Sequence, residues 1–294
     1  MATPDSTSRP ARRNSSGLAR DVEILDLLAG PEALREGGLR VVRMAELLDR
    51  DKAAVSRALA TLADAGLLTR DPERLTYQLG ARLYALAAMT GEAALAQRAR
   101  PVLRRMVHTA RETTHLCVLR GGNVLTLASE LSPYEVGTAS WAGTTTAAWR
   151  TPSGRVLLSD WDRGSIHSWY VAHGHDDALV NPTESRPPGE FSVLFEPPSD
   201  SVRVRDLDSL HAEIELIRKR GFAISDEELE HGVVAASAPV WDSSGAIVAA
   251  LNVSAPKSRL GHRLDDLGAF VAHCGEALSA ELGGPSRPTG PTPI

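Results

Sequence analysis

The stretch VRMAELLDRDKAAVSRALATLADAGLLTRDPERLTYQL, residues 42–79, decides the N-terminal fold. Its pattern predicts a short helix over about 43–48, a turn, and a second helix over about 52–65 that Asp51 caps and Gly66 ends. The strand-like segments LLTR and LTYQL then flank a turn at 71–74, which predicts a hairpin with one buried face.

An amphipathic helix precedes this stretch. Apolar residues recur from Leu18 to Leu28 at intervals of three and four, and the pattern stops before Gly30 and Pro31. Three helices followed by a hairpin make a winged helix-turn-helix, a module whose second helix enters the major groove of DNA.

The outward face of the second helix supplies the candidate DNA contacts. Val55, Leu59 and Leu62 form its apolar stripe, so small and basic residues point away from the core. Arginine and lysine suit both phosphates and base edges. An alternative is a helical packing or dimerisation module whose arginines are only solvated. The predicted DNA-binding residues on this face and in the hairpin are Lys52, Ala53, Ser56, Arg57, Arg70 and Arg74.

Bulk composition limits the other possibilities. The chain has 294 residues, 43% of them hydrophobic, and the net charge is −5, so overall charge does not indicate nucleic-acid binding. No apolar run approaches a membrane span and no signal peptide is visible, which predicts a cytoplasmic protein with no membrane partner. Cys117 and Cys274 are too few for a disulfide framework or a cysteine-rich metal site, and we expect both in cores.

The remaining pattern predicts the domain order. A hairpin turning at Gly121-Gly122, several later strands and flanking helices indicate an α+β domain around an antiparallel sheet. A Pro-rich stretch, 174–205, is expected to be an irregular loop. The predicted boundaries are a disordered basic arm over 1–16, the winged helix-turn-helix over 17–80, a linker helix over 81–98, the α+β domain over 99–282 and a disordered tail over 283–294.

Two segments carry a family resemblance. AAVSRALATLADAGLLTRDPERLTYQLGARL (53–83) resembles the DNA-binding domain and linker of IclR-type transcriptional regulators, and RGFAISDEELEHGVVAASAPVWDSSGAIVAALNVSAP (220–256) resembles their effector domain. The resemblance extends from about Gly17 to Leu282. It implies a GAF-like effector domain, a dimer or dimer of dimers (a homotetramer), and a pseudo-palindromic double-stranded DNA operator.

The effector domain also offers a candidate ligand site. Thr151-Pro152 is a helix start whose free amides attract anions such as carboxylates, although an ordinary capped helix without a ligand has the same sequence. Residues two apart on the strands near 233–237 and 252–254 share a sheet face. By resemblance, these positions line a cavity for a small carboxylic or aromatic acid. The predicted effector-binding residues are Trp141, Trp149, Ser153, Gly154, Ser225, Val233, Ala235, Asn252 and Ser254. For the two tryptophans, which flank the helix start, packing in the core is an equal alternative to forming aromatic walls of the site.

Some positions depart from the family pattern. Ser225 stands where an acidic residue is common, Val234 where a basic residue is common, and Ala235 where cysteine is frequent. The identity of the ligand therefore does not follow from the resemblance.

Enzymatic and metal-binding roles have little support. Ser153 is not in a nucleophile elbow, and we interpret the acidic run 226–228 as surface charge or a helix-terminus feature. The run 173–176 offers metal-type ligands without a second cluster. We predict no catalytic residue, no metal and no cofactor. The alternatives are a helix-turn-helix fused to an enzymatic domain, and an architectural DNA binder without a ligand.

Overall fold

The computed structural model describes residues 17–180 and 201–285, which form two compact units. The predicted basic arm, the final residues of the predicted tail and the prolines of the predicted 174–205 loop lie outside the described residues. Within the described part, no helix is both long and apolar enough to cross a membrane.

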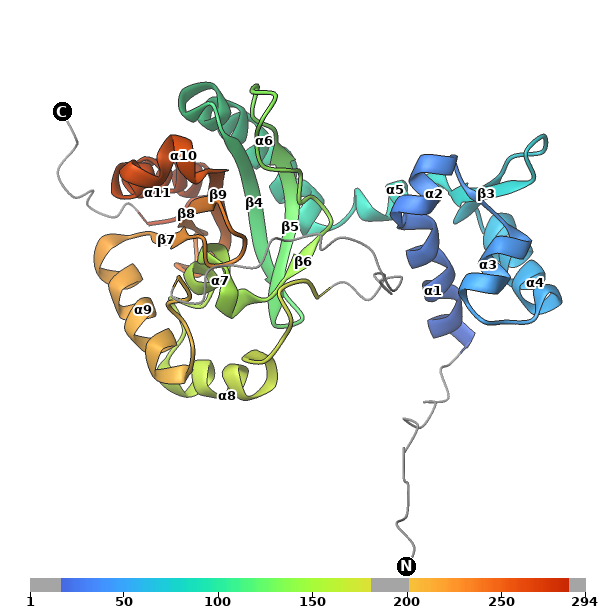
Figure 1. The fold of residues 1–294 in the computed structure, drawn as a ribbon, viewed down its shortest axis with the longest axis horizontal. Coiled ribbons are helices and arrows are strands. Elements are labelled where there is room, and N and C mark those ends of the chain that lie inside the picture. Colours follow the sequence, from blue (N-terminus) through green and yellow to red (C-terminus); the bar gives the residue numbers. More distant parts are fainter. Residues whose placement is uncertain (1–16, 181–200, 286–294) are drawn as a thin grey trace, which may run out of the picture. The chain divides into compact units, whose positions relative to one another are not determined.

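The first unit, residues 17–90, is a small helical bundle with a three-stranded sheet (Figure 1). The strand order is β1-β3-β2 and both pairings are antiparallel. Its elements are α1 (Gly17–Ala29), α2 (Pro31–Glu36), β1 (Leu39–Arg40), α3 (Val41–Leu47), α4 (Lys52–Asp64), β2 (Leu68–Arg70), β3 (Thr76–Leu79) and α5 (Ala81–Ala87).

One apolar cluster holds this unit together, and it uses the predicted stripe of α4. Val55, Leu59 and Leu62 are buried, together with Ile24 of α1 and Tyr77 of β3. Burying each large aliphatic side chain contributes about 1.5–3 kcal/mol, so this cluster is the main source of stability in a unit of this size. The predicted winged helix-turn-helix is confirmed.

The ends of α4 form as predicted. The carboxylate of Asp51 accepts a hydrogen bond from the amide of Ala54 at 2.9 Å. Gly66 follows the helix with φ +73, a left-handed conformation that glycine adopts without strain. Two features were not predicted: α2, and the pairing of β1 with β3 that makes a third strand beside the hairpin.

The predicted linker helix differs in extent. Leu79 ends β3, α5 stops at Ala87, and a separate helix, α6 (Gly91–Ala110), runs on without a break through Pro101. The predicted boundary at residue 98 therefore falls inside a helix. Its residues Val102, Leu103 and Met106 are buried, and this packing compensates for the backbone hydrogen bond that a proline cannot donate.

The second unit is built on a six-stranded antiparallel sheet in the order β6-β5-β4-β9-β8-β7. The strands are β4 (Thr113–Arg120), β5 (Asn123–Glu130), β6 (Thr145–Thr146), β7 (Ala223–Asp226), β8 (Val233–Trp241) and β9 (Ile247–Pro256). The helical elements besides α6 are η1 (Ala148–Arg150), α7 (Pro152–Leu157), α8 (Arg163–His173), α9 (Leu207–Arg220), α10 (Lys257–Leu260), η2 (Gly261–Arg263) and α11 (Leu264–Glu281).

Helices cover both faces of this sheet (Figure 1). On β4 the buried residues alternate: Leu116 and Val118 pack with α6 and α11, whereas Cys117 packs with α7 and α9 on the other face. The same alternation on β9 turns Leu251 and Val253 toward α11 and Asn252 toward α7. The predicted α+β class is confirmed, and the face under α7 is where polar strand residues gather.

The interpretation of the acidic run 226–228 as surface charge is wrong for Glu228. The run begins at the last residue of β7, and the Glu228 side chain is 3% exposed in an ion pair with fully buried Arg155 of α7 at 2.9 Å. Because a buried carboxylate without a partner is costly, Glu228 depends on this guanidinium.

Candidate functional site

The outward face of α4 offers unpaired cations. Lys52, Ala53, Ser56 and Arg57 are all exposed, as the buried stripe requires. Neither the Lys52 ammonium nor the Arg57 guanidinium forms a hydrogen bond or ion pair with another described residue. Both groups are therefore available to a phosphate or a base edge.

The hairpin presents the other two predicted arginines. Arg70 and Arg74 are exposed, and the Arg70 guanidinium lies 5.9 Å from the Tyr77 ring centroid. The Asp71 carboxylate accepts hydrogen bonds from the amides of Glu73 and Arg74, at 2.9 and 3.0 Å, which holds the pKa of Asp71 below its ordinary value. This capped turn fixes the position from which the wing arginines extend.

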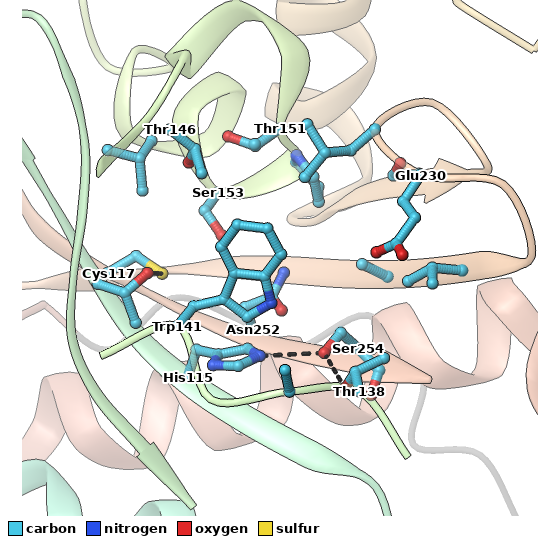
Figure 2. Close-up of a pocket in the computed structure, with 18 of the residues that line it drawn as sticks. His115, Cys117, Thr138, Trp141, Thr146, Thr151, Ser153, Glu230, Asn252 and Ser254 are labelled. Carbon is cyan, nitrogen blue, oxygen red and sulfur yellow. Dashed lines mark hydrogen bonds between the residues drawn. The ribbon is translucent and has the colours of Figure 1, made fainter. Parts of the chain in front are cut away.

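The second unit contains a cavity of about 370 Å³ between the sheet and α7 (Figure 2). Strands β4, β8 and β9 form its floor, α7 begins at one wall, and the β7–β8 loop and the segment carrying Trp141 complete it. The lining residues are His115, Cys117, Val124, Thr126, Gly137, Thr138, Ala139, Trp141, Thr146, Thr151, Pro152, Ser153, Ser225, Leu229, Glu230, Gly232, Val233, Ala235, Asn252, Ser254 and Pro256.

A buried histidine organises one part of the floor. His115 Nδ1 bonds to the Ser129 hydroxyl at 2.8 Å. Its Nε2 bonds to the Ser254 hydroxyl at 3.0 Å, and the Thr138 hydroxyl bonds to that of Ser254 at 2.7 Å (Figure 2). Burial lowers the pKa of His115 to about 4, so the ring is neutral at physiological pH. His115 therefore supplies hydrogen bonds and no positive charge.

A second polar group lies at the start of α7. The hydroxyls of Ser153 and Ser237 are 2.8 Å apart, Ser237 donates to the carbonyl of Leu251 at 2.9 Å, and the Asn252 amide donates to Ser237 at 3.4 Å. Thr151 caps the helix by accepting from the amide of Gly154 at 3.2 Å. This series of hydrogen bonds ties the start of α7 to β8 and β9, so a ligand bound to Ser153 would also affect these two strands.

The thiol of Cys117 is part of the wall and is not activated. Burial raises its pKa above the ordinary value, although contacts with Ser153 and Thr126 oppose that shift. A protonated, buried thiol is a poor nucleophile. Cys274, the other cysteine, is partly buried, and burial raises its pKa to about 11.

Seven of the nine residues predicted for the effector line this cavity, and Trp149 and Gly154 do not. The Trp149 indole N–H donates to the carbonyl of Asp176 at 3.3 Å, and the Arg150 guanidinium lies 4.9 Å from the Trp149 ring centroid. A Cβ on Gly154 would lie 2.1 Å from the Ala148 carbonyl oxygen, so this glycine allows close packing of α7 on η1.

Sequence reasoning missed the polar residues that β4, β5 and the loops contribute. His115 and Cys117 lie two apart on THLCVL, a spacing that gives them one face, but their place beside Asn252 depends on the pairing of β4 with β9. Glu230 is on a loop, where no periodicity exists to detect it.

The run 173–176 is tied into the structure. His173 Nδ1 pairs with the Asp176 carboxylate at 2.9 Å, and Asn123 donates to the same oxygen at 2.7 Å. Within residues 17–180 and 201–285, no three His, Cys, Asp or Glu side chains are arranged to hold a metal ion.

Comparison with known families identifies both units. Residues 17–72 match the IclR helix-turn-helix domain, and residues 87–177 and 201–280 match the bacterial transcriptional regulator IclR C-terminal domain. The regulator BhcR of Paracoccus denitrificans is 28% identical over 265 residues, 89% of this chain and 85% of its own length. The Pca regulon regulatory protein of Pseudomonas putida is 27% identical over 228 residues, 77% of this chain and 70% of its own length.

Solved structures share the fold. The Thermotoga maritima IclR structure covers 90% of this chain and 98% of its own, with a TM-score of 0.67 and 20% identity. An IclR homologue from Microbacterium hydrocarbonoxydans, complexed with 4-hydroxybenzoate, covers 90% of this chain and 100% of its own, with a TM-score of 0.67 and 19% identity. The family matches of both units and the curated relatives are to transcription regulators, which sets aside the fused-enzyme alternative.

Proposed function

Because this chain belongs to the IclR family of DNA-binding transcriptional regulators with an effector-binding C-terminal domain, we propose that a small organic acid in the 370 Å³ cavity controls its affinity for an operator. The cavity is the observation that carries this proposal. Its lining includes several hydroxyls, the Asn252 amide and the Trp141 ring, a combination that suits a compact ligand with a polar group and an apolar body. The 4-hydroxybenzoate bound by the Microbacterium homologue is a ligand of this kind.

The acid would rest its carboxylate on hydroxyl and amide donors. Among the described residues that line the cavity none is lysine or arginine, so hydrogen bonds must replace an ion pair. Ser153, Asn252 and Ser254 supply donors on the floor and at the start of α7. The Trp141 ring would cover the apolar body of the ligand (Figure 2).

On the DNA side, we assign sequence recognition to α4. Lys52, Ala53, Ser56 and Arg57 would face the major groove, and Arg70 and Arg74 of the hairpin would hold the adjacent backbone. Ligand and operator binding are linked, so the acid changes operator affinity by the same factor as the operator changes acid affinity.

We further propose that the chain works as a homodimer or a dimer of dimers. The side chains of Tyr84, Leu86 and Met89, on and after α5, are 77%, 56% and 87% exposed. Large apolar side chains gathered on a short helix favour a protein partner, and a second copy of this helix is the simplest one. Light scattering coupled to gel filtration measures the assembly, and Tyr84→Ser with Met89→Ser should shift it toward the monomer.

A mobility-shift titration tests the main proposal. Purified protein is titrated onto the intergenic DNA beside its own gene, with competitor DNA and a panel of carboxylic and aromatic acids. A specific shift that one acid strengthens or weakens supports the proposal. A specific shift that no acid changes would refute acid control while leaving DNA binding intact.

A further inference from the structure

The β7–β8 loop carries two glutamates that are each paired with a cation. Glu227 pairs with Lys257 at 2.6 Å and accepts a hydrogen bond from the amide of Gly232 at 2.8 Å. Glu228 pairs with buried Arg155. These bonds anchor the loop to α10 and to α7, so the residues between 228 and 232 are held in place over the cavity.

Glu230, in the same loop, differs from both. Its carboxylate points into the cavity (Figure 2), and no described residue donates a hydrogen bond to it or pairs with it. Burial raises the pKa of Glu230 above its ordinary value, because water is partly removed and nothing in the protein replaces it. An unpaired carboxylate of this kind is stabilised most by a ligand that donates a hydrogen bond to it.

The charge that the described lining residues carry is therefore negative. Glu230 is the one carboxylate among the described lining residues, and His115 is neutral with both ring nitrogens engaged by hydroxyls. A plain carboxylic acid entering this space would place a second negative charge beside the first without a cation between them. An acid that also carries a hydroxyl or amino group can turn its carboxylate toward the floor and its donor toward Glu230.

We propose that Glu230 determines the specificity of the cavity, and that the effector is a small acid bearing a hydroxyl or amino group that donates a hydrogen bond to this carboxylate. This inference rests on the proposed function, which gives the organic acid, and it adds that the acid carries a hydrogen-bond donor. A site with an unpaired charged acceptor rejects an analogue that lacks the donor, because binding that analogue desolvates the carboxylate without compensation. Hydrogen bonds to charged groups predict a preference of about tenfold to a hundredfold.

The experiment compares probes of similar shape on the full-length protein. Isothermal titration calorimetry measures the Kd of 4-hydroxybenzoate and 4-aminobenzoate, which carry the donor, and of 4-methylbenzoate, which replaces it with a methyl group. The neutral 4-hydroxybenzyl alcohol carries the phenol without the carboxylate. Each is titrated into the wild type, into Glu230→Met, and into Glu276→Met, a control on α11 on the other face of the sheet.

We expect the wild type and the Glu276 variant to bind the donor-bearing acids at least tenfold more tightly than 4-methylbenzoate, and Glu230→Met to lose that preference. Circular dichroism checks that both variants fold. Equal binding of 4-hydroxybenzoate and 4-methylbenzoate by the wild type, or a preference that survives Glu230→Met, would overturn the role of Glu230 and leave the acid effector standing.

The alcohol separates the two proposals. If the alcohol binds to the wild type but not to Glu230→Met, while none of the acids binds, the proposal of a hydrogen-bond donor to Glu230 is supported and the proposal of an acid effector is wrong. If none of the four probes binds at millimolar concentration, both proposals are wrong for this ligand class.

Discussion

The guanidinium of Arg155 and the carboxylate of Glu228 form an ion pair of 2.9 Å in which the two side chains are 0% and 3% exposed. It joins the helix that begins at the cavity wall to the loop that covers the cavity. Among the residues that the structure describes, Arg155 Nη2 and Glu228 Oε1 have no hydrogen-bond partner, so the pair leaves hydrogen-bonding capacity unused. Arg203 contributes a second, longer contact of 3.7 Å to Glu228.

Removing one partner of this pair should be costly. We expect Arg155→Met to lower the free energy of unfolding of the C-terminal unit by about 3–5 kcal/mol, because Glu228 is left buried and charged with only the longer, part-exposed contact to Arg203. All five tryptophans lie within residues 141–241, so tryptophan fluorescence, excited selectively over tyrosine, reports on this unit during urea unfolding.

Two variants control that measurement. Arg203→Met removes a guanidinium that is 40% exposed and should cost less than about 1 kcal/mol. The double variant Arg155→Met with Glu228→Gln removes both charges and should recover part of the loss. If Arg155→Met and Arg203→Met cost the same, the buried pair does not carry the stability assigned to it.

Local patterns in the sequence were enough to predict the DNA-binding unit. The stripe Val55, Leu59 and Leu62, the cap at Asp51 and the glycine at 66 act within one or two helical turns, so no tertiary information is needed to place α4 and its exposed face. The missed helix α2 is six residues long and shows no amphipathic repeat, and its residue Ala33 is buried through tertiary packing.

The cavity was predictable only in part. Ser153, Asn252 and Ser254 follow from a helix start and from period-two alternation, both local features. His115 reaches the same floor only because β4 pairs with β9, which is more than a hundred residues away in sequence. Glu230 faces the cavity because ion pairs hold its neighbours: Glu227 pairs with Lys257 and Glu228 with Arg155. These pairs join residues far apart in the sequence, so no local pattern predicts the orientation of Glu230.

Arg57→Ala should weaken binding to the operator by roughly fivefold to 150-fold, since a good base contact from arginine is worth about 1–3 kcal/mol. The Arg57 side chain has no described partner within the protein, so its loss should leave the fold and ligand affinity unchanged. Fluorescence anisotropy with operator DNA measures the change, and Arg163→Ala, an arginine of α8, is the matched control. Unchanged affinity for Arg57→Ala would mean that α4 does not present this residue to a base.

Arg74→Ala tests the wing by its salt dependence. If Arg74 contacts a phosphate, its removal should weaken binding to specific and to non-specific DNA by a similar factor. It should also reduce the steepness of the plot of log K against log salt concentration by about 1. Binding measured between about 50 and 200 mM salt gives both quantities. A loss confined to the operator sequence, with an unchanged slope, would instead assign Arg74 to base recognition.

His115 should make the C-terminal unit sensitive to acid. Burial depresses the pKa of this group from 6.5 to about 4, so the folded state disfavours the protonated ring. The stabilisation is complete above pH 6.5 and is lost as the pH falls toward 4, by up to about 3 kcal/mol.

Urea unfolding of the wild type and of His115→Gln at several pH values separates this effect from that of the carboxylates, which both proteins share. The difference in unfolding free energy between the two should shrink on acidification through this window, and exposed His167→Gln should follow the wild type. Curves that stay parallel from pH 7 to 4 would show that His115 takes up its proton without cost, contrary to its place in the hydroxyl network of the floor.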